Sequence, residues 1–439
     1  MDFGPVIFLL FVVLYTLIAV WLGNRSITMP MFFLAVGAFT GEDGLGWIPI
    51  SLSSESAKIL LEITLALLLF ADASTIKLFQ LKEDAGPPAR LLGLATPLII
   101  FLGGVLAFAF FPVEGIGFAL LIGAILAPTD ASLGLPLFTN PRVPVRIRRA
   151  LNLESGLNDG ITTPFVSLFT ALAVAELNQT LTGWLASALL DIFVAVAVGT
   201  ALGLFGGWLF TVAARSRLTS RTVEQMGTMA LALAIYFASV TLGGNGFIAA
   251  FVGGLFFSYA TRHRQHQAVE FTETVGTLFS LFVWTVFGSV LVISLFTAFN
   301  PLALLYAIMS LTLIRMLPVT LSLAGIHFRT DTKLLMGWLG PRGLASVVFT
   351  LIAFESFQEI ARPHQNLFAI AGWTILLSVL LHGFSAMPLA RWYADRLKMV
   401  PDSIPEMLDV PDLEPRQNRL TPLHEQSAPP ADSIAKTGE

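Results

Sequence analysis

Among the ionisable side chains inside long apolar stretches of this 439-residue sequence, nine are candidates for chemistry: Lys58, Glu62, Asp72, Asp130, Glu154, Asp159, Asp191, Arg315 and Arg342. A charge at the centre of a lipid bilayer is costly, so each of these residues is a candidate for ion chemistry or for a buried ion pair. Lys58, Glu62, Asp72 and Asp191 lie near the ends of their stretches or lack a polar neighbourhood. We interpret these four as snorkelling or paired side chains.

Asp130 and Asp159 have polar surroundings that suit a hard cation. Asp130 follows Pro128 and Thr129 near the middle of an apolar stretch, and proline breaks a helix at such a position. Carbonyls freed by a break are tolerated in a membrane only where they line a cavity or are buried in protein. In the next stretch, Ser155 and Asp159 are four residues apart and share a helix face. Hydroxyl, carbonyl and carboxylate oxygens are typical ligands of hard cations.

A second break is expected downstream, where Gly340, Pro341 and Gly343 surround Arg342. By our count of apolar stretches, the first break lies in the fifth (116–138) and the second in the twelfth (334–354). Because this offset is an odd number, equivalent helices in the two halves run in opposite directions. Paired broken helices in such halves are typical of transporters with inverted repeats and a site near the bilayer midplane.

The remaining core charges leave one carboxylate to titrate. Asp130, Glu154 and Asp159 share the core with Arg315 and Arg342. If Glu154 pairs with one arginine and Asp130 is hydrogen-bonded near the other, Asp159 is left over. Such a carboxylate can hold either a proton or a cation, and competition between the two is itself a mechanism of exchange.

Composition supports a membrane protein and excludes several other classes. Hydrophobic residues make up 55% of the chain and charged residues 12%, whereas soluble domains contain about 25% charged residues. Large soluble proteins and nucleic-acid-binding proteins are therefore excluded, and the absence of cysteine excludes disulfide scaffolds and thiolate chemistry. Thirteen apolar stretches, of which the second is short, predict spanning helices: about 5–22, 29–40, 53–76, 91–112, 116–138, 150–175, 183–213, 222–242, 245–260, 271–295, 301–325, 334–354 and 367–391.

The loop charges predict the orientation of these helices. If the N-terminus is outside, the basic clusters of the loops fall on the cytoplasmic side, as the positive-inside rule requires. We therefore expect a transmembrane domain over residues 1–396, with two crossing broken helices and no cleaved leader. Residues 397–439 are expected to form a disordered acidic cytoplasmic tail, which carries the whole net charge of −4.

Six motifs together resemble the monovalent cation:proton antiporter family, in its NhaP/NHE-like sodium/proton branch. They are LLFADAS (68–74), APTDASLG (127–134), NLESGLNDG (152–160), GGNGFIAAFVGGL (243–255), RMLPV (315–319) and GPRGLAS (340–346). The resemblance covers roughly residues 10–390. It implies the NhaA-like antiporter fold of two inverted six-helix repeats, a homodimer, and elevator-like movement of a six-helix core against a dimer domain. The motif around Asp72 departs from that of the animal exchangers, so the family assigns this residue no role.

The resemblance also implies a cation site. Asp159 looks like the aspartate that binds both cation and proton, and Asn158 like its partner in the Asn-Asp motif of electroneutral exchangers. Thr129 looks like the ligand at the broken helix, with Asp130 beside it, and Ser155 like a further oxygen ligand for Na+.

Two structural roles follow from the same resemblance. Glu154 and Arg342 look like an ion pair that secures the helix of the Asn-Asp motif to the second broken helix. Arg315 looks like the cation that stabilises the crossing.

The expected function is Na+ (or Li+)/H+ exchange for pH homeostasis, with K+/H+ exchange as the alternative. We expect no cofactor and no enzymatic activity. The expected partners are the monovalent cation, the proton, the lipid bilayer and a second copy of the chain, and nucleic acid is not among them. The expected location is a prokaryotic plasma membrane. An intramembrane aspartyl enzyme using Asp130 and Asp159, and a channel, are less favoured readings.

Overall fold

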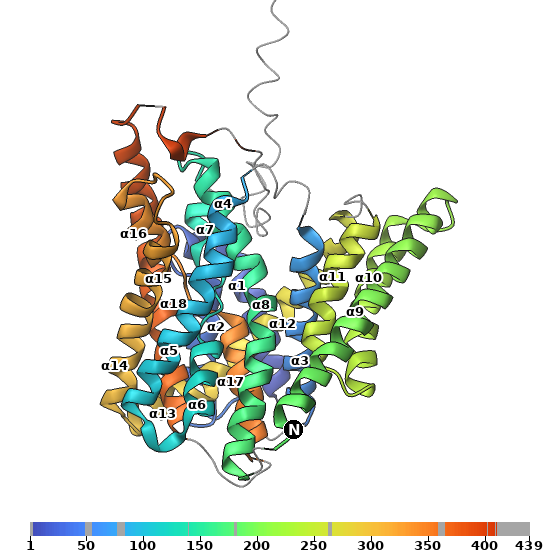
Figure 1. The fold of residues 1–439 in the computed structure, drawn as a ribbon, viewed down its shortest axis with the longest axis horizontal. Coiled ribbons are helices and arrows are strands. Elements are labelled where there is room, and N and C mark those ends of the chain that lie inside the picture. The colour runs from blue at the N-terminus through green and yellow to red at the C-terminus, as the bar shows by residue number, and fades with distance from the viewer. Residues whose placement is uncertain are drawn as a thin grey trace, which may run out of the picture.

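The computed structural model describes residues 3–48, 55–76, 84–138, 140–179, 182–261, 266–358, 365–401, 403–408 and 410. Throughout these ranges the regular structure is helical, and the helices stand roughly parallel in a tall bundle (Figure 1). Residues 411–439, most of the predicted tail, lie outside the described ranges. The helical segments follow the order of the thirteen predicted stretches, with each broken helix counted once. The prediction of an all-helical polytopic fold is confirmed.

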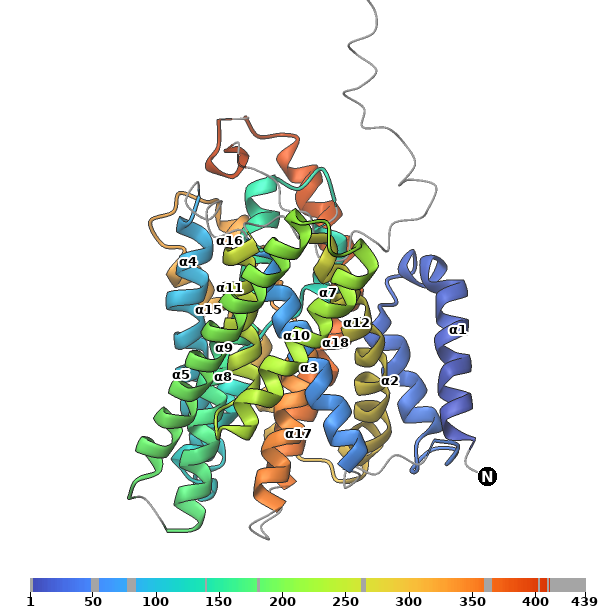
Figure 2. The same ribbon diagram turned by 90° about the vertical axis from the view of Figure 1, so that its right-hand side faces the viewer.

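The first set of helices, which we call the scaffold bundle, comes from the start and the middle of the chain. Its members pack mainly against one another. They are α1 (Gly4–Gly23), α2 (Met29–Thr40), α3 (Glu55–Thr75), α9 (Trp184–Arg215), α10 (Arg221–Thr241), α11 (Gly246–Thr261), α12 (His266–Phe287), the π-helical turn η4 (Gly288–Val292) and α13 (Ile293–Thr297). Helices α1 and α2 lie at one edge of the molecule (Figure 2).

The second set, the crossing bundle, contains both broken helices. It comprises α4 (Gly86–Arg90), η2 (Leu91–Ala95), α5 (Thr96–Phe110), η3 (Pro112–Glu114), α6 (Ile116–Ile125), α7 (Ala131–Phe138), α8 (Val145–Leu177), α14 (Pro301–Met309), η5 (Ser310–Ile314), α15 (Arg315–Ser322), α16 (Thr330–Trp338), α17 (Leu344–Gln358) and α18 (Gln365–Leu397). Figure 1 shows α5, α14 and α16 on the side opposite α9, α10 and α11.

Length and composition identify eight long membrane-spanning candidates in the described residues. Four shorter apolar helices accompany them: Met29–Thr40, Ile116–Ile125, Gly246–Thr261 and Leu344–Phe357. Two of these short helices, α6 and α17, are halves of the broken helices. The breaks are where the sequence predicts them, because the stretch after Ile125 contains Pro128 and the stretch after Trp338 contains Pro341.

A short stretch after α18 is packed against the bundle. The 3₁₀ turn η6 (Pro405–Met407) places Glu406 with no exposed surface. Its carboxylate accepts hydrogen bonds from Arg329 N at 2.7 Å and Thr332 Oγ1 at 2.8 Å. The sequence assigned residues 403–408 to the tail, but this stretch ties the ends of the crossing bundle together.

Two glycines allow α2 to approach α12 and η4 closely. A Cβ atom added at Gly37 would collide with the carbonyl of Thr285, and one added at Gly288 would collide with the carbonyl of Leu34. Small residues permit such backbone contact between membrane helices, where packing replaces the hydrophobic effect.

We expect Gly37→Ala to lower the free energy of unfolding by about 1–3 kcal/mol, because overpacking forces the two backbones apart. Thermal unfolding of the purified protein in detergent would measure this change. Gly23→Ala is the matched control, since no atom lies within 4 Å of a Cβ at Gly23. Equal melting temperatures for the two variants would contradict the packing argument.

Candidate functional site

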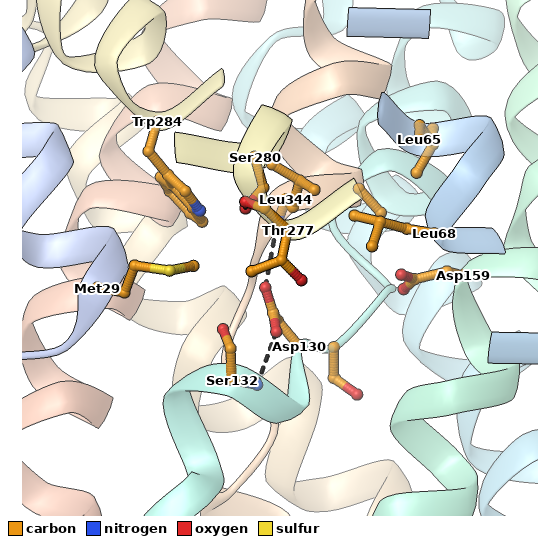
Figure 3. Close-up of a pocket in the computed structure, with 12 residues that line it drawn as sticks. Met29, Leu65, Leu68, Asp130, Ser132, Asp159, Thr277, Ser280, Trp284 and Leu344 are labelled. Atoms are coloured by element: carbon orange, nitrogen blue, oxygen red, sulfur yellow. Dashed lines mark hydrogen bonds between the residues drawn. The ribbon is translucent and has the colours of Figure 1, made fainter. Parts of the chain in front are cut away.

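A pocket lies between the two bundles. Its scaffold wall is formed by Met29 of α2, Leu65 and Leu68 of α3, and Thr277, Ser280 and Trp284 of α12 (Figure 3). Its crossing wall is formed by Thr129, Asp130, Ser132, Asp159, Leu344 and Ala345. The two candidate aspartates therefore face the same space, and the opposite wall contributes two hydroxyl-bearing side chains.

The two breaks cross at Asp130. Its backbone N–H donates to the carbonyl of Pro341 at 2.8 Å, which joins the breaks directly. One carboxylate oxygen accepts from Ser132 N at 2.7 Å and the other from Leu344 N at 3.3 Å (Figure 3). These N–H groups belong to the first turns of α7 and α17, where the helix dipole favours a negative charge. Asp130 therefore caps two helices, one from each half of the chain.

Arg342 donates to a C-terminal helix end, whereas Asp130 caps N-terminal ends. Its guanidinium Nη1 donates to the carbonyl of Ala127 at 2.7 Å, just beyond the end of α6. The last carbonyls of a helix lack partners within the helix, and in a membrane they must find a donor in the protein. Ser346 Oγ donates to the carbonyl of Ile125 at 2.7 Å and satisfies another of them.

His382 of α18 is a participant that our sequence analysis did not assign. Its Nε2 lies 2.8 Å from the carbonyl of Trp338, the last residue of α16, and its ring stacks on that indole. Its Nδ1 lies 3.2 Å from Ser378 Oγ, which in turn accepts from the backbone N–H of Arg342. The signal available in the sequence was that His382 is the one histidine within a predicted span.

A buried ion pair connects α8 with α15. Arg315 donates to both carboxylate oxygens of Glu154, with Nη1–Oε1 at 2.5 Å and Nη2–Oε2 at 3.0 Å, and each side chain is 1% exposed. The predicted pairing of Glu154 with Arg342 is therefore wrong, and the roles expected of the two arginines are exchanged. The physical reason is that Arg342 lies in the break, where the end of α6 takes its guanidinium.

Polar side chains of the first break and of α8 form one cluster. Asn158 Nδ2 donates to Thr129 Oγ1 at 2.5 Å, and Thr129 Oγ1 lies 3.2 Å from Ser155 Oγ. Asp159 is partly exposed at the pocket, one helical turn after Ser155. The structure thus joins three of the five predicted ion-binding residues, Thr129, Ser155 and Asn158, through their side chains. Asp159 and Asp130 line the same pocket as Thr129.

The amide oxygen of this cluster is unsatisfied. The Oδ1 oxygen of Asn158 is buried and has no hydrogen-bond partner among the described residues. A buried acceptor without a donor costs free energy unless a ligand or water satisfies it. Since a cation is satisfied by oxygen atoms of this kind, the donor set fits a hard monovalent cation.

The other charges found within the spans have different surroundings. Lys58 Nζ pairs with Glu355 Oε1 at 2.6 Å, which agrees with the interpretation of Lys58 as a paired side chain. Asp72 is 4% exposed in α3. Asp191 lies in α9, where its backbone carbonyl accepts from Asn245 N at 3.3 Å. None of these three residues lines the pocket between the bundles.

Comparison with known proteins gives one family. Residues 7–392 match the family described as sodium/hydrogen exchanger, transmembrane. The K(+)/H(+) antiporter NhaP of Alkalimonas amylolytica is 26% identical over 384 residues, which are 86% of this chain and 65% of that protein. The Na(+)/H(+) antiporter ApNhaP of Aphanothece halophytica is 26% identical over 370 residues, 80% of this chain and 68% of that protein.

The K(+)/H(+) antiporter NhaP2 of Shewanella sp. strain MR-4 is also 26% identical, over 62% of its length. This chain therefore spans less than two thirds of the length of the two K(+)/H(+) relatives. Among solved structures, the sodium proton antiporter MjNhaP1 of Methanocaldococcus jannaschii at pH 8 matches with a TM-score of 0.73. That match has 23% sequence identity and covers 89% of this chain and 98% of the other. The likeness establishes a common fold.

We expect Glu154→Met or Arg315→Met alone to lower the free energy of unfolding by about 3–5 kcal/mol, because each leaves an uncompensated buried charge. The double variant should lose much less than the sum, since two apolar side chains remove both charges. Thermal unfolding of the detergent-solubilised variants completes this double-mutant cycle.

Two sets of control variants accompany the double-mutant cycle of Glu154 and Arg315. A cycle of Glu154 with Arg342 should show weaker coupling, because Arg342 donates to a carbonyl. Asp395→Asn should be nearly silent, since the Lys398–Asp395 pair is 60% and 62% exposed. Additive losses for Glu154 and Arg315 would contradict the observed pairing.

Proposed function

The chain belongs to the sodium/hydrogen exchanger family, and we propose that it exchanges Na+, or Li+, for H+ across a membrane in a one-to-one, electroneutral cycle. The observation that supports this proposal best is the position of Asp159 at a pocket beside three neutral oxygen-bearing side chains: Thr129, Ser155 and Asn158. We assign Asp159, Thr129 and Ser155 as the Na+ ligands, and Asn158 supplies a further oxygen.

The other core charges support competition at a single carboxylate. Glu154 is neutralised by Arg315, and Asp130 accepts two backbone N–H groups. Arg342 donates to a helix end. Each of these charges has a partner inside the crossing bundle, and we assign the exchange of proton and cation to Asp159 because it lines the pocket. When Asp159 holds either a proton or a sodium ion, the loaded site carries the same net charge, so each crossing is electroneutral.

The pocket lies between the bundles, and this supports alternating access. A site with one wall on each bundle can be opened to either side by movement of the crossing bundle relative to the scaffold bundle. We propose that the crossing bundle carries Asp159 during this movement, since the aspartate, the Thr129 cluster and both breaks all belong to it. The scaffold bundle then supplies the contact for a homodimer.

K+/H+ exchange is the second candidate. The observation that favours it is that two relatives matching most of this chain are named K(+)/H(+) antiporters. Ion selectivity depends on the geometry and field strength of the ligands, and the same residue types can serve either cation. A transport assay must therefore decide between the two ions.

We further propose that the protein is a transporter with no enzymatic activity, cofactor or nucleic-acid partner. Both carboxylate oxygens of Asp130 cap helices, which argues against an aspartyl dyad that shares one proton with Asp159. The basic loops support a plasma-membrane orientation with the N-terminus outside and the tail in the cytoplasm.

We expect Asp159→Asn to abolish Na+-dependent pH relaxation in everted membrane vesicles, because an amide cannot exchange a proton for a cation. The fluorescence of a pH-sensitive dye after addition of Na+ to energised vesicles measures this directly. Asp191→Asn is the matched control, since Asp191 lies in a scaffold helix outside the pocket, and it should retain the wild-type rate.

The same vesicle assay determines which cation is exchanged for the proton. Additions of Na+, Li+ and K+ in parallel should give relaxation with Na+ and Li+, whereas a response to K+ alone would establish the second candidate. Full Na+-dependent relaxation by Asp159→Asn would show that the binding aspartate is misassigned.

A further inference from the structure

An ion pair between described residues joins the two bundles. Lys58 of α3 lies in the scaffold bundle, and Glu355 of α17 lies in the crossing bundle, with 2.6 Å between Nζ and Oε1. In contrast, the Arg146–Asp84 pair lies within the crossing bundle and the Arg221–Glu270 pair within the scaffold bundle. The contact between Lys58 and Glu355 must therefore break if the bundles move relative to each other at this level.

The pair lies beyond one end of the pocket. Lys58 is seven residues before Leu65, and Glu355 is eleven residues after Leu344, where Leu65 and Leu344 both line the pocket. At 1.5 Å per helical residue, these separations are about 10 Å and about 16 Å along the axes. The start of α3 and the end of α17 meet at the lower end of the molecule in Figure 2. In the orientation proposed above, this end is outside the cell.

Lys58 has a second carboxylate within reach on its own helix. Glu62 lies one turn further along α3 and interacts electrostatically with both Lys58 and Glu355. It also lies near Tyr236 of α10, in the same bundle. Residues four apart on a helix can pair, so the ammonium group can move from Glu355 to Glu62 without becoming uncompensated.

The strength of the pair suits a contact that opens repeatedly. Both side chains are 38% exposed, and ion pairs with this access to water are weak. The Glu154–Arg315 pair is 1% exposed on each side and lies within the crossing bundle, so it is preserved when that bundle moves. The exposed Lys58–Glu355 pair can therefore break and re-form, whereas the buried Glu154–Arg315 pair stays intact.

We propose that Lys58 and Glu355 form the outer gate of the pocket, closed in this structure, and that Lys58 transfers to Glu62 when the gate opens. The proposal rests on the exchange function proposed above, because a gate has meaning only for a transported ion. It assigns positioning roles to three charged residues that stand outside the Asp159 site.

Chemical cross-linking tests the gate, and the absence of cysteine provides a clean background. The variant Lys58→Cys/Glu355→Cys is treated in vesicles with a cleavable bis-methanethiosulfonate, because a direct disulfide requires Cα atoms closer than about 7 Å. We expect Na+-dependent relaxation to fall to the level of vesicles without the protein and to return when the linker is reduced.

A matched pair within one bundle controls for the reagent. Asp84→Cys/Arg146→Cys, treated identically, should keep its rate, because both residues move together with the crossing bundle. Unchanged transport in the cross-linked Lys58/Glu355 variant would overturn the gate while leaving the exchange function intact. Absence of Na+-dependent relaxation in vesicles that contain the untreated wild-type protein would instead refute the exchange function.

A second measurement tests the transfer to Glu62. Thr277→Cys places a thiol in the pocket, and its labelling by a membrane-impermeant maleimide added from the outside reports opening. Adding Glu355→Gln should speed labelling by about threefold, as expected for the loss of a weak ion pair. Adding Glu62→Gln should slow it, because the open state loses its partner for Lys58. A change in the same direction for both variants would overturn the transfer.

Discussion

The crossing of two broken helices is the constraint on which the rest of the structure depends. A bilayer offers no water to the ends of a helix, so every end created inside the membrane must be satisfied by protein groups. Asp130 accepts hydrogen bonds from N–H groups at the positive, N-terminal ends of α7 and α17. Arg342 donates to a carbonyl just beyond the C-terminal end of α6, and His382 contacts the last carbonyl of α16. Because these three side chains are engaged at helix ends, few charges of the crossing bundle remain that can change their state in the proposed exchange.

The Glu154–Arg315 pair connects the helix crossing with the proposed ion site. Glu154 precedes the Asn158–Asp159 pair by one turn of α8, and Arg315 follows the π-helical turn η5 in the neighbouring segment. By holding α8 on α15, the pair fixes the face that carries Ser155 and Asp159 toward the break at Thr129. A rigid crossing bundle can then move as a unit without rearranging the ligands.

The elements of this fold are predictable because their signals are local. Long apolar stretches mark the helices, and Pro128 and Pro341 mark the breaks. The partners of charges are less predictable because they depend on three-dimensional packing. Arg315 and Arg342 are the same residue type in the same bundle, and only the structure shows which one reaches Glu154. His382 belongs to no motif, because its ring nitrogens contact only local groups, the carbonyl of Trp338 and the carbonyl and hydroxyl of Ser378.

The reciprocity of the crossing makes each half of the chain incomplete without the other. Asp130 in the first half caps α17 in the second, and Arg342 in the second half satisfies α6 in the first. A lone first half would bury the end of α6 without Arg342, and a lone second half would bury the start of α17 without Asp130. The two halves are therefore complementary rather than independent units. Because six helices return the chain to its starting side, the opposite orientation of the second half requires one additional linking helix, the place that α9 occupies.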